Sequence, residues 1–115
     1  MRVLVAGLGN MGRSHALAYH NHPDATLAAL VNRSPVDLPS ELGDYPVYDD
    51  FEAALAEVKP DLVCIATYSD SHANYAIAAL DAGAHVFIEK PLATTVADAE
   101  RVIQKANATG RKLVV

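Results

Sequence analysis

Short apolar segments alternate with helical patterns along the whole sequence. The apolar runs are residues 2–6, 26–31, 46–48, 61–67, 85–88 and 112–115. Such alternation is typical of parallel β-α-β units. The run from Leu62 to Ala66 is apolar throughout, which indicates a strand whose sheet has helices on both faces rather than one face in water. The chain is therefore predicted to be an α/β protein with a doubly wound, parallel, six-stranded sheet.

Helix-type spacing of apolar residues fills the intervals between these strands. The first helix is expected to start near Asn10 and to end before Pro23. The predicted caps and stops of the later helices are Asp49 or Asp50, Ser71, Gly83, Thr95 and Gly110. The residues expected to face the sheet are, helix by helix, Met11, His15, Ala18 and Tyr19; Phe51, Ala54, Leu55 and Val58; Ala73, Ala76, Ile77 and Leu80; and Val96, Ala99, Val102, Ile103 and Ala106. Residues 32–45 have no clear period and are predicted to form a loop with a short helical turn.

The composition fits one domain. The chain has 115 residues, 51% of them hydrophobic and 20% charged, which is enough for one core and too short for two domains. Nine Lys and Arg against 14 Asp and Glu give a net charge of -5, so a surface that follows nucleic-acid phosphates has no electrostatic support. We therefore expect no nucleic-acid partner, and any anion site must be local.

No segment predicts membrane insertion or export. No apolar run approaches the ~20 residues that span a bilayer, and residues 1–10 lack the pattern of a signal peptide. A cytoplasmic protein without a membrane partner is expected. The one cysteine, Cys64, lies in an apolar strand and excludes an internal disulfide. His15, His20 and His22 lack the spacing of metal ligands on one helix face, and no carboxylate completes a site, so no metal is expected.

A glycine-rich turn follows the first strand directly. Residues 7–12 read Gly7-Leu8-Gly9-Asn10-Met11-Gly12, a GxGxxG pattern that opens a helix within a β-α-β unit of about 30 residues. In this context the pattern predicts a dinucleotide-binding turn of the Rossmann type. Gly7 would make the tight turn, Gly9 would let the backbone approach a pyrophosphate, and Gly12 would let the helix pack closely on the strand. The amides and the positive end of the helix would bind the phosphates.

The end of the second strand is a second recognition point. About 20 residues after the last glycine, NAD-binding domains carry an Asp or Glu that accepts hydrogen bonds from the adenosine ribose. This chain has Asn32-Arg33-Ser34 there. Asn32 brings no carboxylate that would repel a 2′-phosphate, while Arg33 and Ser34 offer a cation and a hydroxyl. NADP is therefore predicted in preference to NAD; the alternative is that Arg33 is a solvated loop residue and the site accepts either cofactor.

The second half of the chain carries the motifs of a known family. From Asp61 the sequence reads DLVCIATYSDSHANYAIAALDAGAHVFIEKPLATT. The sequence resembles the Gfo/Idh/MocA family of NAD(P)-dependent oxidoreductases in five features. They are GLGNMG, His15 three residues after it, the Ala66-Thr67 pair, His72 and Glu89-Lys90-Pro91. The resemblance covers the whole chain.

This resemblance implies a domain organisation and an activity. Residues 1–115 would form the dinucleotide-binding Rossmann domain, and the C-terminal substrate domain, which mediates oligomerisation, would be absent from this chain. The full-length enzyme, expected to be a homo-oligomer, would transfer a hydride between nicotinamide and a hydroxyl-bearing carbon of a sugar, cyclitol or similar small molecule. The chain alone is expected to be inactive, because the acid/base partners of its lysine would lie in the missing domain.

The resemblance also implies residue roles. Lys90 would be the catalytic residue, pointing toward the nicotinamide and the substrate hydroxyl, and Glu89 would contact the nicotinamide ribose or the backbone. Ala66, Thr67 and Tyr68 would pass the nicotinamide ribose and pyrophosphate, although the family often has Pro where Tyr68 stands. His72 is placed in the same cofactor site, with a hydrogen bond to the strand loop favoured over a catalytic role.

Two other interpretations stay open at this stage. Dehydrogenases of the β-hydroxyacid type also carry a GLGxMG turn and an Asn-Arg-Ser/Thr strand end, although Glu89-Lys90-Pro91 argues against that class. The chain could also be a non-catalytic module that senses a dinucleotide.

Overall fold

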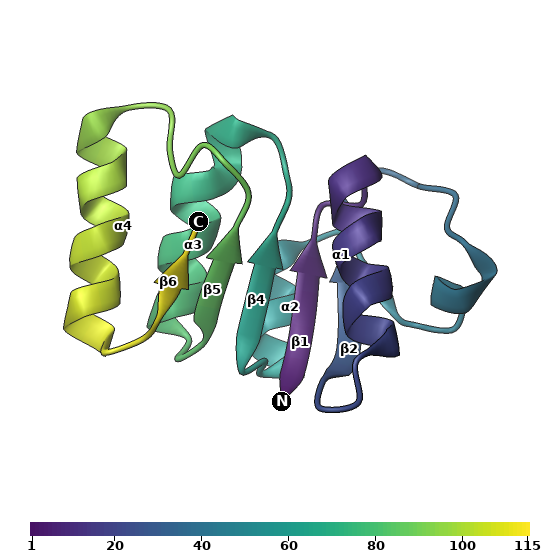
Figure 1. Cartoon of the computed structure of the whole chain (residues 1–115). Coiled ribbons are helices and arrows are strands. Elements are labelled where there is room, and N and C mark those ends of the chain that lie inside the picture. The colour runs from purple at the N-terminus through teal and green to yellow at the C-terminus, as the bar shows by residue number, and fades with distance from the viewer.

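The computed structural model describes all residues from 1 to 115, and helices and strands alternate along most of the chain (Figure 1). The strands are β1 (Arg2–Ala6), β2 (Thr26–Val31), β3 (Val47–Tyr48), β4 (Leu62–Ile65), β5 (His85–Ile88) and β6 (Leu113–Val114). The α-helices are α1 (Asn10–Asn21), α2 (Phe51–Val58), α3 (His72–Asp81) and α4 (Val96–Thr109). Two short 3-10 turns, η1 (Ser40–Leu42) and η2 (Ser69–Ser71), complete the order.

All six strands form one parallel sheet in the order β3-β2-β1-β4-β5-β6. This order reverses direction beside β1, as in doubly wound dinucleotide-binding folds. The predicted α/β fold class and strand number are confirmed. β4 and β6 are shorter than the predicted runs 61–67 and 112–115.

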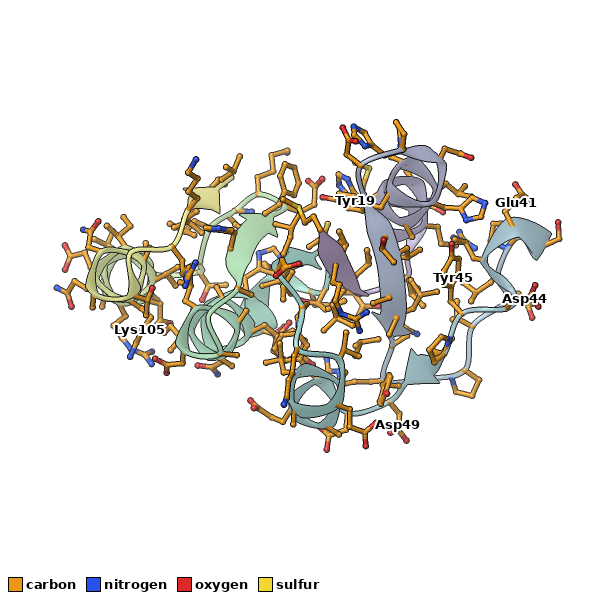
Figure 2. All side chains as sticks on the ribbon, turned by 90° about the horizontal axis from the view of Figure 1, so that it is seen from below. Tyr19, Glu41, Asp44, Tyr45, Asp49 and Lys105 are labelled. Atoms are coloured by element: carbon orange, nitrogen blue, oxygen red, sulfur yellow. The ribbon has the colours of Figure 1, made fainter.

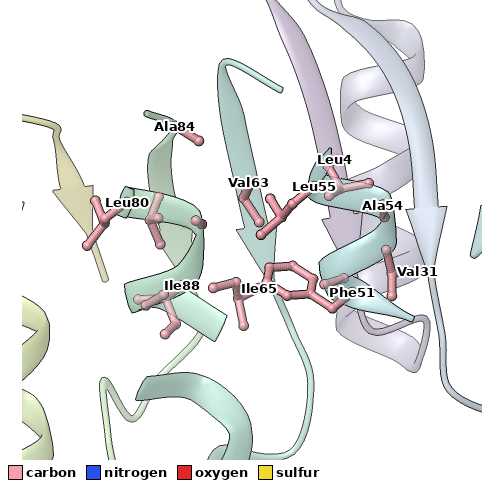
Figure 3. Packing of buried hydrophobic residues seen from close by; sticks show 14 of the residues in the cluster. Leu4, Val31, Phe51, Ala54, Leu55, Val63, Ile65, Leu80, Ala84 and Ile88 are labelled. Carbon is pink, nitrogen blue, oxygen red and sulfur yellow. The ribbon is translucent and has the colours of Figure 1, made fainter. Parts of the chain in front are cut away.

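Helices cover the two faces of the sheet unequally. Figure 2 shows α1 on one side of the sheet and α2 and α3 on the other. A cluster of 19 buried residues packs α2, α3 and α4 onto the sheet, and Figure 3 shows its centre around Phe51, Leu55, Val63 and Ile65. A cluster of 8 buried residues, which includes Ala16 of α1, lies on the opposite face.

The inward faces of two helices are narrower than the periodicity predicts. On α1, Met11 is 54% exposed and Ala18 is also exposed, whereas Gly12 and Ala16 are buried against the sheet. The small residues let α1 approach closely, so its contact face is centred on them and the larger side chains lie to the sides.

The same correction applies to the last helix and, in part, to α3. On α4, Val96 is 76% and Ile103 is 46% exposed, and only Val102 and Ala106 are buried. α4 lies beside α3 at the edge of the sheet, where it needs a narrow apolar stripe. On α3, Ile77 is half-buried rather than fully inward.

Two of the three predicted N-cap residues make a capping hydrogen bond with their side chain. The Asp50 carboxylate accepts hydrogen bonds from the amides of Glu52, at 3.0 Å, and Ala53. The Thr95 hydroxyl accepts one from the amide of Asp98 at 3.1 Å. Ser71 is the N-cap residue of α3 as predicted, but its side chain makes no capping hydrogen bond: as the last residue of η2 it has helical backbone, and its hydroxyl donates to the Tyr68 carbonyl at 2.8 Å.

None of the helices has both the length and the apolar character needed to cross a bilayer.

Candidate functional site

The loops that carry the predicted site meet at one edge of the sheet. Ala6 of β1 lies opposite Val31 of β2 and Ile65 of β4, and Ile65 lies opposite Ile88 of β5. These four residues are the last of their strands, so the segments that follow them leave the sheet side by side. Ligands of parallel α/β sheets bind beyond this carboxyl edge, where the strand order reverses.

The glycine turn brings α1 against β1 and β4. Gly7 has φ +92°, a conformation that side chains other than glycine rarely adopt, and its amide donates to the Val31 carbonyl at 2.8 Å. A Cβ on Gly12 would overlap the Gly7 carbonyl oxygen, so the third glycine is required for the helix to pack. Both predictions for these glycines are confirmed.

The first turn of α1, at the carboxyl edge of the sheet, offers backbone N–H groups that suit an anion. A Cβ on the N-cap residue Gly9 would meet nothing within 4 Å, so the backbone there is accessible. No side chain caps the helix and no acidic residue lies in its first turn. The free amides and positive end of the helix therefore face the space above the turn. This geometry fits a dinucleotide phosphate group.

Asn32 holds the glycine turn to the end of β2. Its Oδ1 accepts a hydrogen bond from the Leu8 amide at 3.1 Å, and its Nδ2 donates to the Ser34 carbonyl at 2.7 Å. In the sequence, Asn32 is notable only because it brings no carboxylate that would repel a 2′-phosphate. In the structure it links two segments predicted to contact the cofactor, through a hydrogen bond between residues 24 apart in sequence.

Eight of the predicted cofactor residues line one cleft with a volume of about 300 Å³. They are Gly7, Leu8, Gly9, Asn32, Ser34, Ala66, Thr67 and Tyr68. Val36, which the sequence reasoning missed, also lines it. Val36 lies in the aperiodic loop after β2, where no pattern marks a residue as part of a site.

Arg33 lies in a neighbouring hollow of about 450 Å³ that shares Asn32 and Ser34 with the cleft. Its side chain makes no hydrogen bond or ion pair within the chain, so the guanidinium is free to meet an anion. Asp49 lines the same hollow. The cap of α2 is Asp50, so the Asp49 carboxylate makes no capping hydrogen bond. The hollow therefore holds one free cation and one free anion.

The remaining predicted residues lie outside the cleft lining. Asn10 and Met11 form the exposed first turn of α1, where Asn10 Oδ1 accepts a hydrogen bond from Arg13 at 2.7 Å. Glu89 and Lys90 follow β5 at the same edge of the sheet, and the Glu89 amide donates to the Ile65 carbonyl at 2.9 Å. Lys90 is exposed, and the peptide bond between it and Pro91 is cis.

His72 is buried and joins two of the site loops. Its relative exposure is 1%, and its Nδ1 and Nε2 lie 2.7 Å from the Pro91 carbonyl and 3.0 Å from the Thr67 carbonyl. The contact with Thr67 agrees with the prediction that His72 forms a hydrogen bond to the loop after β4. Because both ring nitrogens face backbone oxygens, the imidazole connects two loops of the protein.

A pair that the sequence reasoning missed connects α1 with the loop after β5. His15 Nε2 lies 2.5 Å from Glu89 Oε1, and both side chains are about one-fifth exposed, at 21% and 23%. The His15 ring also packs edge-on against Phe87, with ring centroids 5.2 Å apart. The two partners are 74 residues apart, so helical or strand spacing could not have revealed the pair.

Comparisons with known proteins agree with this geometry. A family model described as "Oxidoreductase family, NAD-binding Rossmann fold" matches residues 1–115. The chain is 34% identical to 4-carboxy-2-hydroxymuconate-6-semialdehyde dehydrogenase of Sphingobium over 96% of its length, and 30% identical to inositol 2-dehydrogenase of Paracoccus denitrificans over 99%. A crystal structure of scyllo-inositol dehydrogenase from Lactobacillus casei, with NAD(H) and scyllo-inositol bound, superposes with a TM-score of 0.88 at 27% identity over 98% of this chain and 35% of that chain.

The chain spans about a third of the length of these relatives, 36% of the first enzyme and 35% of the second.

Proposed function

Because the chain belongs to the Gfo/Idh/MocA oxidoreductase family, whose NAD-binding Rossmann fold covers residues 1–115, we propose that it binds NAD(P) across the carboxyl edge of its sheet for a dehydrogenase reaction. The observation that carries this proposal is the first turn of α1. Its amides have no cap and are accessible at Gly9, and they point into the space beside the cleft formed by the loops after β1, β2 and β4. A pyrophosphate would be held there by backbone N–H groups and by the helix dipole.

The other loops are suited to the two ends of the same cofactor. Asn32, Arg33 and Ser34 would lie by the adenosine ribose, and Ala66, Thr67 and Tyr68 by the pyrophosphate and the nicotinamide ribose. The cofactor, when bound, supplies or accepts the hydride. Lys90 would orient the substrate hydroxyl and stabilise negative charge on its oxygen, as an ammonium can at an exposed position beside a cofactor site.

A direct titration tests the cofactor site. We expect the chain to bind NADH, detected by the change in nicotinamide fluorescence, and Gly9→Val to bind it at least tenfold more weakly because the branched side chain would occupy the pyrophosphate position. Gly9 has φ -71°, so the substitution leaves the turn unstrained. Wild-type protein that binds neither NADH nor NADPH would contradict the proposal.

We further propose that the adenosine end prefers NADP, with Arg33 as the residue that recognises the 2′-phosphate. The support is the free guanidinium in a hollow adjoining the cleft and the absence of an acidic residue at position 32. Asp49 opposes this preference, because its carboxylate lines the same hollow and would repel a phosphate.

The two charges give a test with opposite expected signs. Arg33→Ala should weaken NADPH binding about tenfold and leave NADH binding within twofold, since a charge-assisted hydrogen bond contributes ~1.5–3 kcal/mol. Asp49→Asn should strengthen NADPH binding and leave NADH binding unchanged. Equal affinities of the wild type for the two cofactors, unaffected by Arg33→Ala, would rule out this preference.

For the whole enzyme, we propose a hydroxyl-bearing small molecule, such as a cyclitol or sugar, as substrate. The relatives include inositol 2-dehydrogenase and a D-glucoside 3-dehydrogenase of Escherichia coli. We propose that a second domain supplies the partner acid/base residues and the contacts of a homo-oligomer. A longer version of the chain that carries this domain should reduce NAD(P) with such a substrate, and Lys90→Met should lower its kcat by at least 100-fold.

A further inference from the structure

The residues on both sides of Lys90 are held by histidines from two different helices. Glu89 precedes it and contacts His15 of α1 at 2.5 Å. Pro91 follows it, and the Pro91 carbonyl lies 2.7 Å from His72 Nδ1 at the start of α3. Lys90 itself is exposed and makes no hydrogen bond or ion pair within the chain. Its position is therefore set by its two neighbours.

We propose that His15 and His72 are positioning residues for Lys90, and that the His15–Glu89 pair ties the loop of Lys90 to the helix that begins at the glycine turn. This inference rests on the proposed cofactor site. α1 starts at the glycine turn, and His15 lies three residues after Gly12, one turn along the same helix. A cofactor whose phosphates bind at the start of α1 would then meet Lys90 at a fixed distance.

The chemistry of the pair supports a positioning role over a surface contact. A hydrogen bond between imidazole and a carboxylate is charge-assisted, so it is shorter and stronger than a neutral one. Both side chains are mostly shielded from water, which weakens competition from solvent. The edge-on contact of His15 with Phe87 of β5 fixes the ring plane.

His72 supplies the second restraint from the opposite side. It is the only polar or charged residue among the buried residues, and its other ring nitrogen lies 3.0 Å from the Thr67 carbonyl, in the cleft-lining loop after β4. The same imidazole therefore relates the Lys90 loop to the loop proposed to pass the nicotinamide ribose. Each histidine thus joins the Lys90 loop to a different wall of the cofactor site.

Comparing the affinities of two ligands distinguishes positioning of Lys90 from a general effect on cofactor binding. NADH carries the nicotinamide, whereas ADP-ribose has the same adenosine and pyrophosphate without it. His15→Gln, Glu89→Gln and His72→Gln should each weaken NADH binding about fivefold to tenfold and leave ADP-ribose binding within twofold. The double variant of His15 and Glu89 should match the stronger single variant, because both changes remove one contact. His22→Asn, at the exposed end of α1, is the matched control and should change neither affinity.

A second measurement does not depend on any ligand. Amide hydrogen exchange at Glu89, whose N–H donates to the Ile65 carbonyl, should become faster in His15→Gln and His72→Gln, and ¹⁵N relaxation should show larger motion at Lys90. Both should stay unchanged in His22→Asn. Unchanged dynamics at Lys90 would overturn the inference, as would equal weakening of NADH and ADP-ribose. If the wild type bound neither ligand, the proposed function would fail, and the dynamics of Lys90 would still decide whether the histidines position it.

Discussion

The backbone at Gly12 lies so close to the backbone at Gly7 that no side chain fits between them. A Cβ at position 12 would overlap a carbonyl oxygen, which cannot move without displacing the turn, whereas a Cβ at Gly9 has free space. Gly12→Ala should therefore lower the free energy of unfolding by about 2–3 kcal/mol, as overpacked positions do. Gly9→Ala is the control at the same turn and should cost no more than about 1 kcal/mol, because it meets no steric clash and loses only the preference for Gly over Ala at an N-cap. Urea denaturation of the two variants measures the difference; similar losses would show that α1 can move away from β1.

Cys64, which is fully buried beside the half-buried Tyr19, has consequences for stability at high pH. Burial raises the pKa of the Cys64 thiol to about 12, against a smaller lowering by its hydrogen bond with Tyr19. Burial also raises the pKa of Tyr19. A raised thiol pKa means that the unfolded state loses its proton first, so this contribution to stability is complete below pH 9 and is lost as the pH rises from 9 towards 12.

Stability measured between pH 8 and 11 tests this pair. Unfolding free energy should fall over that range in the wild type and fall less in Cys64→Ala, once the lower starting stability of the variant is subtracted. The thiol should also react with an aromatic disulfide reagent only as fast as the protein unfolds, because Cys64 is fully buried. Rapid modification at pH 8 in native protein would contradict the buried geometry.

At this scale, the sequence identifies residues whose role depends on local geometry. Gly7 and Gly12 are recognisable because a turn and a close approach demand glycine wherever they occur. The partners of Asn32, His15 and His72 cannot be recognised in the sequence, because these contacts join segments that only the folded sheet brings together. His15 could be considered for metal binding from its neighbours in sequence, while its actual partner lies on another loop.

Among the elements, the helix caps show which local signals are sufficient. Asp50 and Thr95 cap α2 and α4 because their backbone is extended, with φ -119° and -134°, which aims each side chain at the amides of the first helical turn. Ser71 also stands directly before its helix, but as the last residue of η2 it has helical backbone, with φ -95° and ψ -8°, and its hydroxyl donates to the Tyr68 carbonyl instead. The helix faces differ for a related reason: periodicity finds the apolar stripe, whereas its buried width depends on what the helix packs against.

Asp50 and Asp49 provide a test of the capping contact within one dipeptide. Asp50→Ala should lower the free energy of unfolding by about 1 kcal/mol, since it removes the acceptor for two amides of α2. Asp49→Ala should change it by less than half of that, because Asp49 makes no capping contact. Thermal unfolding followed by circular dichroism compares them; equal losses would indicate that general charge near the helix start, rather than the cap, stabilises α2.

For the whole molecule, the two faces of the sheet are stabilised to different extents. The face under α2, α3 and α4 carries the cluster of 19 buried residues, and the face under α1 carries the cluster of 8. Right-handed crossovers place these helices, because every connection after β3 runs in the same direction along the sheet. The parallel six-stranded sheet could be predicted from the alternation, and the helix sides follow from this rule once the strand order is known; the order itself is a result of the structure.

The two phenylalanines of the chain lie on these opposite faces and measure the asymmetry. Phe51 is 3% exposed and stacks on Tyr75 with ring centroids 4.1 Å apart, inside the larger cluster. Phe87 is only partly buried and packs against the smaller one. Phe51→Ala should therefore cost about 3–5 kcal/mol, because it leaves a cavity that the surrounding sheet and helices cannot close. Phe87→Ala should cost less than half as much, since water already reaches the ring and can fill the space. Urea denaturation gives both values. A larger loss for Phe87 would mean that the face beside α1 contributes more to stability than its buried residues indicate.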